Sequence, residues 1–444
     1  MKGNDGVRSA PYSIAMISVH SSPLGKLGTQ DTGGMSVYIR ELSRQLGLRG
    51  HGVDIFTRGG DGHAPGEVLR MSENVRLVPL EMGPEANAPK TALYPHLFGF
   101  FREMDRFQRQ EGVFYDLIHS HYWLSSQVGR RARQAWGVPH ITTFHTLGAV
   151  KNIVCGPGSE PEVRIAVERN LAAASDRVLV TSDREKENLT RLYAADPHRI
   201  AVAPCGVNLG VFRPMDRATA RRRIGAGADD RLVLYVGRFA PEKGLDRLLQ
   251  AVARLKHMPN LRLIVVGGDG PQDPARQRMA ELSRACGVAD RVEFRGRVEQ
   301  AELPWYYSAA DLLCLPSSYE SFGMTALEAL ACGVPVAATR VGAMEELLQL
   351  PQNGRLAQDF SPEAMARAIA GIVQDPPGTP FRREAIRNSV RRYGWPQIAQ
   401  EMVAVYRAVR TAGGGGHAPG PHDRGAPHAG APAACCGCGL AYHA

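Results

Sequence analysis

Short apolar runs alternate with amphipathic stretches over residues 1–410, and this alternation occurs twice along the chain. In the first half, the apolar runs cover residues 12–19, 53–57, 116–119, 140–143 and 177–181. In the second half, they cover residues 232–236, 261–266, 292–294, 311–315 and 334–338. The helical patterns between them include residues 35–48, 166–174, 245–255, 275–286 and 325–331. Short strands that alternate with helices predict parallel sheets covered by helices.

The break between the two series lies at residues 211–216, where Pro214 predicts a hinge. The sequence therefore predicts an α/β protein with two doubly wound domains, residues 1–213 and 214–394. Because ligands of such sheets bind beyond the carboxyl ends of the strands, two facing domains place the site in the cleft between them. A last helical stretch, residues 395–410, has no strand after it, and we expect it to pack back on the first domain.

The composition narrows the class of protein. The 444 residues are 44% hydrophobic and 22% charged, as in ordinary globular domains. The chain has no run of about 18 apolar residues and no apolar signal-peptide core at its N-terminus, so we expect a cytoplasmic protein without a transmembrane helix. Residues 411–444 are rich in Gly, Ala, Pro and His. We expect this tail to be disordered, because it has few large apolar side chains to bury.

The net charge of +9 bears on the choice of partner. The excess of Lys and Arg is divided almost evenly between the two halves of the chain, whereas proteins that bind nucleic acids usually cluster their positive charge. A dispersed positive field suits a small anionic substrate better. We therefore expect no nucleic-acid partner, and the sequence leaves open whether the protein forms a homodimer.

Glycines precede the first long helical pattern. Residues 28–34 (Gly-Thr-Gln-Asp-Thr-Gly-Gly) follow the first apolar run and open the helix expected at 35–48. Backbone N–H groups at a helix N-terminus are open to an anion, and the helix dipole favours negative charge there. The sequence alone leaves two interpretations open, namely an anion site at Gly34 and a tight turn without a ligand.

Two cations follow the first apolar run of the second half, where a ligand of this sheet is expected. They are Arg238 and Lys243, and Lys is scarce in this chain. Arg offers a bidentate fork and Lys a point charge, which together suit a diphosphate. The alternative is a solvated loop with two surface cations.

A third motif, Pro-Ser-Ser-Tyr-Glu-Ser-Phe-Gly-Met, joins a predicted strand to the next helix. Its carboxylate Glu320 lies eight residues before Glu328, a separation of up to roughly 12 Å along a helix. A retaining glycosidase needs two carboxylates only about 5 Å apart. We therefore expect the two to contact different parts of a long ligand. The amides of Phe322, Gly323 and Met324 would hold an anionic group between them, unless the motif is simply a helix with an acidic first turn.

Together these motifs resemble the donor site of the retaining family 4 glycosyltransferases. The resemblance rests on Arg238, Lys243, Glu320 and Glu328, and it covers roughly residues 12–410. It implies the GT-B architecture, in which two Rossmann-like domains face each other across the active site. The donor-binding residues that it implies are Gly34, Arg238, Lys243, Val298 (in the loop that contacts the base), Glu320, Phe322, Gly323, Met324 and Glu328.

The resemblance also implies what these groups do. Arg238 and Lys243 would hold the diphosphate of a UDP-sugar co-substrate, and the Gly34 amide would reach it from the other domain. Glu328 would bind the ribose hydroxyls, and Glu320 would contact the donor sugar. No Asp-x-Asp pair occurs in the chain, so a metal clamp is not indicated and no cofactor is required. These side chains and the helix start would then stabilise the leaving group.

Motifs in the first domain narrow the resemblance. Residues 18–24, 31–35, 118–125 and 145–152 look like those of D-inositol-3-phosphate glycosyltransferase of mycothiol biosynthesis, a family that transfers GlcNAc from UDP-GlcNAc to inositol phosphate. It implies a small phosphorylated acceptor, bound by His20, Lys90, Tyr122, Thr146 and Arg164. Independently, cations, a phenol and a hydroxyl can together hold a phosphate. The catalytic residues implied are His145, near the donor sugar, with Arg238, Lys243 and Glu320.

The sequence also departs from that pattern. Ser36 stands where the family has an Asn that contacts the acceptor ring, and Lys26 and Leu27 replace a Gln-Pro pair. Val334 stands where a Thr accompanies a Mg²⁺ ion in the family, so Mg²⁺ stays open but is not indicated. Sucrose-phosphate synthase-type enzymes share the fold and the Asp-x-Gly-Gly loop and also use a phosphorylated acceptor. The acceptor therefore remains open between these families.

Other roles for these residues and other functions for the protein also stay open. Without the resemblance, Tyr122 and Thr146 fit core positions, and His145 fits a structural histidine. A nucleotide-sugar epimerase and a non-catalytic nucleotide-sugar binder would use the same donor motifs. A nicotinamide dehydrogenase is disfavoured, because the glycines at residues 267–270 lack the GxGxxG spacing.

Overall fold

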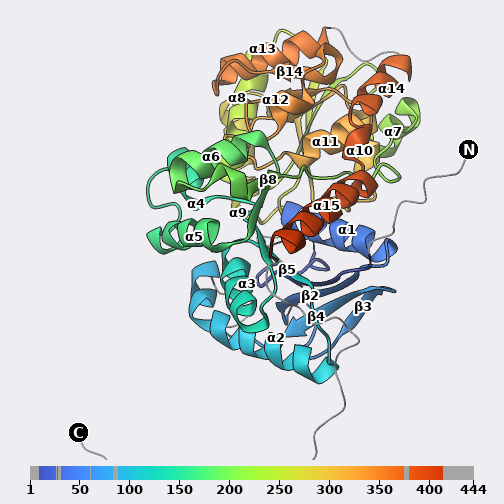
Figure 1. Ribbon diagram of the computed structural model, residues 1–444. Helices are drawn as coiled ribbons and strands as arrows, with labels where there is room; N and C mark the ends of the chain where they lie inside the picture. The colour runs from blue at the N-terminus through green and yellow to red at the C-terminus, as the bar shows by residue number, and fades with distance from the viewer. Residues whose placement is uncertain are drawn as a thin grey trace, which may run out of the picture.

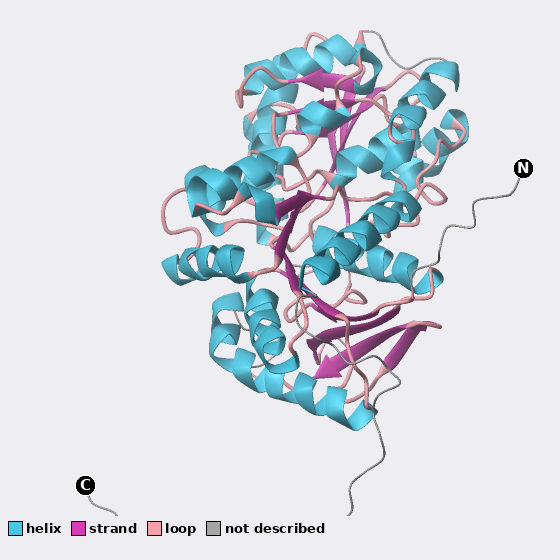
Figure 2. Cartoon of the chain, viewed as in Figure 1, coloured by secondary structure: helices cyan, strands magenta, loops and turns pink. Residues whose placement is uncertain are grey.

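The computed structural model describes residues 10–26, 28, 32–60, 62–83, 89–374 and 380–413. Within these residues the chain forms two sheets, one in the lower half and one in the upper half of the molecule as drawn in Figure 1. In Figure 2 helices lie on the outside of both sheets. This is the pair of Rossmann-like α/β domains that the alternating pattern predicts.

The first sheet has the strand order β3-β4-β2-β1-β5-β6-β7-β8. All neighbouring strands are parallel except the antiparallel pair β3 and β4. The strands are β1 (Ser13–Ile17), β2 (Gly52–Arg58), β3 (Leu69–Ser72), β4 (Val75–Leu80), β5 (Leu117–His121), β6 (His140–Thr143), β7 (Arg177–Val180) and β8 (Ile200–Val202). Every residue of the central strand β1 after its first is buried, because helices cover both faces of the sheet.

Six α-helices belong to this half of the described chain. They are α1 (Gly34–Leu48), α2 (Leu97–Glu111), α3 (Trp123–Trp136), α4 (Gly148–Cys155), α5 (Glu162–Ala174) and α6 (Asp183–Tyr193). In α1, Tyr38, Ile39, Leu42 and Leu46 are fully buried. Their spacing of three and four residues places them on one face of the helix, which packs on the sheet. That packing fixes the N-terminus of α1 at the carboxyl edge of β1.

The second sheet is entirely parallel, with the strand order β11-β10-β9-β12-β13-β14. Its strands are β9 (Arg231–Val236), β10 (Leu261–Val266), β11 (Val292–Gly296), β12 (Leu312–Leu315), β13 (Val336–Ala338) and β14 (Gly354–Leu356). Its helices are α7 (Arg217–Ile224), α8 (Leu245–Arg254), α9 (Pro274–Ala285), α10 (Leu303–Ala309), α11 (Met324–Ala331), α12 (Met344–Leu347), α13 (Pro362–Val373) and α14 (Pro380–Ser389). Buried Leu245, Leu248, Leu249 and Val252 form the apolar face of α8.

Four strands of the structure are absent from the apolar runs in the sequence, namely β3, β4, β8 and β14. Three of them (β3, β8 and β14) lie at sheet edges, where a strand is covered on fewer sides and needs fewer apolar residues. Strand β4 contains Pro79, which weakens the sequence signal of a strand. Partial exposure at the sheet edges therefore accounts for three of the missing strands, and Pro79 accounts for β4.

The last helix, α15 (Trp395–Gly413), crosses back from the second half of the chain to the first (Figure 1). The Trp395 ring lies edge-on to Tyr38 of α1, with 5.5 Å between the ring centroids. Further along α15, the Tyr406 hydroxyl is 2.8 Å from Nδ1 of His119 in β5. The helix is three residues longer than predicted, and the rest of the predicted tail, residues 414–444, lies outside the described residues.

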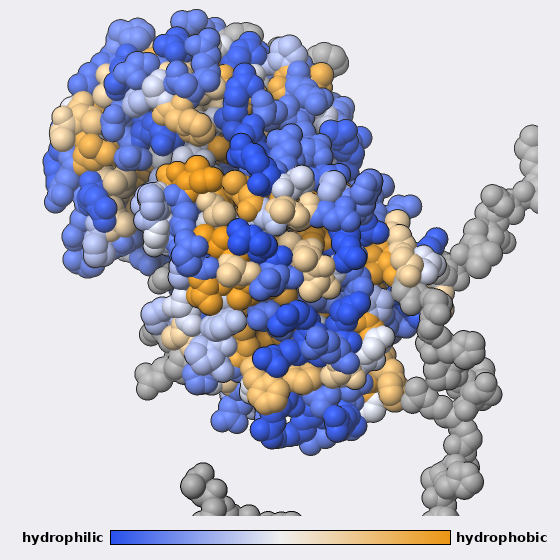
Figure 3. All heavy atoms as spheres, turned by 60° about the vertical axis from the view of Figure 1, so that its left-hand side comes forward, coloured by the Kyte–Doolittle hydropathy of each residue, from blue (hydrophilic) through white to orange (hydrophobic). Residues whose placement is uncertain are grey.

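The surface carries both polar and apolar side chains. In the face shown in Figure 3, hydrophilic side chains predominate and apolar ones gather towards the middle of the molecule.

Among the described residues, no helix has the length and apolar character needed to cross a bilayer.

Candidate active site

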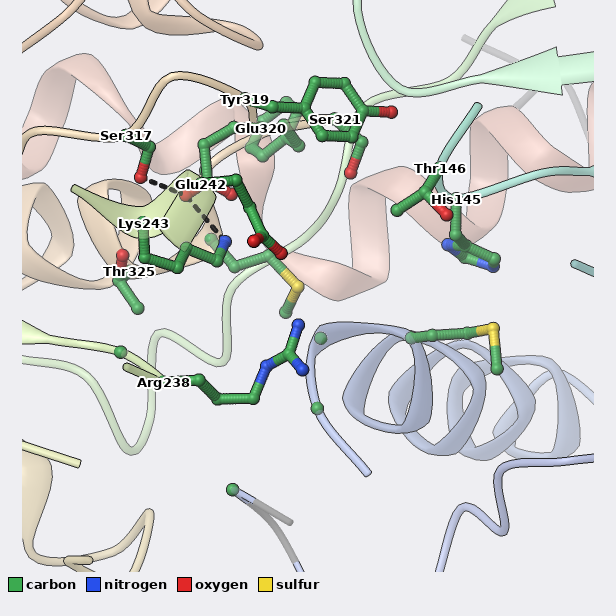
Figure 4. Close-up of a pocket in the computed structure, with 18 of the residues that line it drawn as sticks. His145, Thr146, Arg238, Glu242, Lys243, Ser317, Tyr319, Glu320, Ser321 and Thr325 are labelled. Carbon is green, nitrogen blue, oxygen red and sulfur yellow. Dashed lines mark hydrogen bonds and ion pairs between the residues drawn. The ribbon is translucent and has the colours of Figure 1, made fainter. Parts of the chain in front are cut away.

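One cavity of about 500 Å³ lies between the two sheets, and both domains contribute to its walls. Arg238 and Lys243 lie on one side, and His145 and Thr146 lie across from them (Figure 4). These residues follow β9 and β6, so the cavity lies at the carboxyl ends of the strands, where ligands of doubly wound sheets bind.

The second domain contributes an ion pair to its wall of the cavity. Lys243 ends a short 3-10 turn (Pro241–Lys243) after β9, and its Nζ lies 2.8 Å from a carboxylate oxygen of Glu320. The Ser317 hydroxyl donates to the same oxygen at 2.7 Å. Figure 4 shows Glu242 beside this group and Arg238 reaching into the cavity below it. The sequence motifs after β9 and β12 thus meet in one cluster.

Two helix N-termini face each other across the cavity. Helix α11 begins at Met324 after Gly323, whose φ of +104° suits a residue without a side chain. Helix α1 begins at Gly34, and a Cβ atom there would lie 3.4 Å from the sulfur of Met324. Both helix dipoles therefore favour negative charge in the same space.

Glu328 lies one turn into α11 and is buried against the cavity. The Tyr307 hydroxyl donates to its carboxylate at 2.8 Å. Burial raises the pKa of Glu328 to about 7, although hydrogen bonds from Tyr307 and Gln300 oppose that rise. This carboxyl is therefore poised between its charged and neutral forms near neutral pH.

The first domain forms the opposite wall around the ring of Tyr122. The His20 ring centroid lies 4.4 Å from that of Tyr122, and the Arg164 guanidinium carbon lies 4.8 Å from it. Lys90 Nζ, from the start of a 3-10 helix (Lys90–His96), is 5.7 Å from the same centroid. Desolvation and the charges of Lys90, Arg164, His145 and Arg58 hold the pKa of His20 well below its usual value. The positive charge gathered here suits an anion.

Arg164 is held mainly by partners inside the protein. Its side chain is 1% exposed, and its guanidinium bonds Glu160 at 2.8 Å and Glu168 at 2.7 Å and donates to the Thr146 carbonyl at 2.8 Å. It also donates to the Thr146 hydroxyl at 3.0 Å. Within the described structure, this Arg positions Thr146 and packs under Tyr122. Direct contact between Arg164 and a ligand stays a prediction.

The cavity contains two residues with unusual backbone conformations. Tyr122 directly follows β5 with φ of +78°, and His145 follows β6 with φ of +60°. Such angles are uncommon for residues other than glycine and tend to persist where function requires them. Desolvation lowers the pKa of the buried His145 to about 3, so its ring is neutral at physiological pH.

The structure brings all of the predicted site residues to this one cavity. They are His20, Gly34, Lys90, Tyr122, His145, Thr146, Arg164, Arg238, Lys243, Val298, Glu320, Phe322, Gly323, Met324 and Glu328. Their individual roles stay predictions.

Other residues of the cavity were not predicted. Ser317, Ser321 and Thr325 flank Glu320 in the motif after β12, and Tyr319 reaches across to the other domain. The Tyr319 hydroxyl accepts a hydrogen bond from the Leu147 amide at 3.0 Å. The position of these residues between the end of a strand and the start of a helix could have indicated that they line a site. Their side chains alone do not indicate a particular chemistry.

The position of Val334 bears on a metal site. Its side chain is fully buried and carries no oxygen for a hard cation such as Mg²⁺. Among the described residues, no group of three or more His, Cys, Asp and Glu side chains could hold a metal ion. We derive no step through Mg²⁺.

Comparison with known proteins relates this geometry to a family. Residues 216–392 match the family described as "Glycosyl transferases group 1", and residues 32–211 match "Glycosyltransferase Family 4". The D-inositol 3-phosphate glycosyltransferase of Xylanimonas cellulosilytica is 39% identical over 417 residues, which are 91% of this chain and 98% of the relative. D-inositol 3-phosphate glycosyltransferase 2 of Catenulispora acidiphila is 40% identical over 412 residues, covering 90% of this chain and 96% of the relative.

A solved structure supports the same assignment. Sucrose-phosphate synthase from Thermosynechococcus elongatus superposes with a TM-score of 0.82 and 36% sequence identity, covering 90% of this chain and all of that one. The two facing Rossmann-like domains, the cavity between them and these relatives agree. The chain is therefore a glycosyltransferase of the GT-B fold and belongs to the family 4 and group 1 glycosyltransferases.

Proposed function

We propose that the protein transfers a hexose from a UDP-sugar to a small phosphorylated acceptor, with retention of anomeric configuration. The preferred pair is UDP-GlcNAc and inositol phosphate. One observation carries this proposal: a single cavity has positive side chains on opposite walls, Arg238 with Lys243 on one wall and Lys90 beside the neutral His20 on the other. One suits a diphosphate and the other suits a phosphate.

The donor occupies the wall of the second domain in this proposal. Arg238 and Lys243 bind the diphosphate together with the N–H groups at the start of α11. Lys243 has three N–H donors, so it can keep its bond to Glu320 while it binds a phosphate oxygen. Glu328 accepts hydrogen bonds from the ribose hydroxyls, and Glu320 contacts the hexose.

The transfer step exchanges one bond at the anomeric carbon for another. The bond from this carbon to the diphosphate oxygen breaks, and the acceptor oxygen forms a bond on the same face. The acceptor hydroxyl gives its proton to the departing diphosphate. The positive side chains and helix N-termini stabilise the charge that develops on the leaving group. Closure of the cleft would hold both substrates together and exclude water.

The acceptor occupies the wall of the first domain. Nδ1 of His20 is buried without a hydrogen-bond partner among the described residues, so a ligand can supply one. The names of the curated relatives favour inositol phosphate as the acceptor. The similarity to sucrose-phosphate synthase favours fructose 6-phosphate with UDP-glucose as the second candidate pair.

Release of UDP by the purified protein tests the proposal. UDP-GlcNAc and UDP-glucose would each be offered with inositol phosphate, with fructose 6-phosphate and without acceptor. We expect release only with UDP-GlcNAc and inositol phosphate together. Release with UDP-glucose and fructose 6-phosphate would change the proposed donor and acceptor but leave the proposed mechanism in place. Turnover of the donor without any acceptor would favour an epimerase or a hydrolase, and binding of UDP without turnover would favour a binding protein.

Lys243→Ala tests the diphosphate clamp. Loss of the ammonium removes a charge that is proposed to act on the leaving group, so we expect kcat to fall by about 100-fold or more. Lys256→Ala is the matched control, because Lys256 is an exposed Lys of the same domain that does not line the cavity. Comparable kcat values for the two variants would contradict the role of Lys243.

A further inference from the structure

Two neighbouring strands bring two histidines together at the wall of the cavity. His121 is the last residue of β5, and His145 lies two residues beyond the end of the parallel neighbour β6. Nδ1 of His121 is 2.9 Å from Nε2 of His145. His145 lines the cavity, whereas His121 lies behind it with none of its surface exposed.

The proton positions in this pair follow from its surroundings. Burial keeps the pKa of both rings far below 6.5, so each neutral ring carries one N–H. Nε2 of His121 is buried and has no hydrogen-bond partner among the described residues. A proton there would be a buried donor without an acceptor, which is rarer in proteins than an unpaired acceptor. The proton of His121 therefore belongs on Nδ1, which donates to Nε2 of His145.

This arrangement determines the state of the residue that faces the ligand. Because Nε2 of His145 accepts, the single proton of His145 must lie on Nδ1. We infer that His121 is a positioning residue that holds His145 as its Nδ1–H tautomer, so that His145 presents a hydrogen-bond donor to an oxygen of the sugar in the cleft. The identity of that ligand rests on the proposed function, but the proton position does not.

A second layer of side chains holds His121 in place. The His119 ring lies 4.2 Å from that of His121 between centroids. Both nitrogens of His119 are engaged, Nδ1 by the Tyr406 hydroxyl at 2.8 Å and Nε2 by the Thr143 hydroxyl at 2.9 Å. The His119 ring is thus fixed on both sides and limits the rotation of His121. Helix α15 therefore supports the wall of the cavity from behind.

Nuclear magnetic resonance of the full-length protein tests the tautomer directly. With ¹⁵N-labelled histidine, two-bond ¹H–¹⁵N correlations distinguish a ring protonated at Nδ1 from one protonated at Nε2. The signals of His145 are identified by their loss in His145→Gln. We expect the proton on Nδ1 in the protein without ligand, and a proton on Nε2 would overturn the inference. This measurement needs no substrate.

Substitution of His121 tests its effect on catalysis. His121→Asn keeps an N–H close to the place of Nδ1, whereas His121→Leu has no donor. We expect His121→Leu to lower kcat by about tenfold or more and to change the His145 signals, while the dissociation constant for UDP stays unchanged. His121→Asn should retain kcat within about threefold. This rescue would show that the loss in His121→Leu comes from the missing N–H and not from unfolding. His140→Leu is the matched control, because His140 is an equally buried histidine of the same sheet that does not line the cavity.

The outcomes separate this inference from the proposed function. Absence of transfer with every donor and acceptor would refute the proposed function, and the tautomer would still be measured. Transfer by a protein whose His145 carries its proton on Nε2 would refute only the inference. If His121→Leu keeps both the wild-type kcat and the His145 signals, His121 has no positioning role.

Discussion

At the scale of single residues, the cleft contains a carboxyl whose charge depends on pH in the neutral range. Glu328 is 7% exposed, and burial raises its pKa to about 7. Its neighbour Glu320 is instead bonded to Lys243 and Ser317. Two carboxylates of one motif therefore have different surroundings, which fits different parts of one donor.

Because ribose hydroxyls would donate to the charged form of Glu328, we expect donor binding to weaken as this group gains a proton. The KM for the UDP-sugar should be constant well above pH 7. Below pH 7 it should rise by up to about tenfold per pH unit. Steady-state kinetics between pH 5.5 and 8.5 measure this. Glu328→Gln should have a higher KM that no longer depends on pH. If the KM of this variant still rises below pH 7 as in the wild-type protein, the assignment to Glu328 is refuted.

At the scale of elements, the loop between β9 and α8 depends on one glycine. Gly244 has φ of +67° and separates the turn of Lys243 from α8. A Cβ atom at Gly244 would lie 2.2 Å from the carbonyl oxygen of Pro316, which leads from β12 into the Glu320 motif. The backbones of the two donor motifs therefore approach so closely that a side chain would separate them.

We expect Gly244→Ala to destabilise the protein by about 2 kcal/mol or more, because it combines backbone strain with a backbone clash. Thermal unfolding should show a midpoint several degrees lower. Gly371→Ala is the control, since Gly371 lies in helix α13 with open space around it. Alanine there should leave stability unchanged or raise it by up to about 1 kcal/mol. Equal midpoints for both variants would contradict this reading of the loop.

The sequence predicted the central strands and the glycines at helix starts because these depend on local patterns. It also predicted which residues would meet in the cleft, through a resemblance combined with the rule for strand ends. It did not predict the Lys243–Glu320 pair, which forms between two separate loops. Nor did it predict the bond between His121 and His145, because His121 looks like an ordinary core residue of a strand and its partner lies 24 residues further along the chain. Contacts between side chains that are distant in the sequence cannot be predicted from a local pattern of residues.

At the scale of the whole molecule, contacts between the halves of the chain cluster beside the cleft. The Leu147 amide bonds the Tyr319 hydroxyl at 3.0 Å, and the Ser182 hydroxyl bonds the Ser321 carbonyl at 2.9 Å. Further along the cleft, a guanidinium nitrogen of Arg40 lies 2.6 Å from the Gln300 side chain. These few polar bonds are weak enough to be exchanged if the cleft opens and closes.

The return of α15 to the first half is a much larger contact. Trp395 is 1% exposed and packs on Tyr38 and against Gly206. We expect Trp395→Ala to lower the free energy of unfolding by about 3–5 kcal/mol, because it leaves a large cavity between the halves. Urea unfolding measures the loss. Glu401→Ala, at an exposed position of the same helix, should change it by less than about 0.5 kcal/mol, and similar losses for both would contradict this role of Trp395.

The path of α15 also has a consequence for biosynthesis. The ribosome makes β5, β6 and their histidines early, but Tyr406, which bonds His119, is made only near the end of the chain. A nascent first domain therefore leaves the ribosome without the helix that contacts α1 and His119, and the entire second domain must be translated before that helix arrives. Domains that fold during synthesis usually do so in order from the N-terminus. Here the first domain to emerge is the last to be completed.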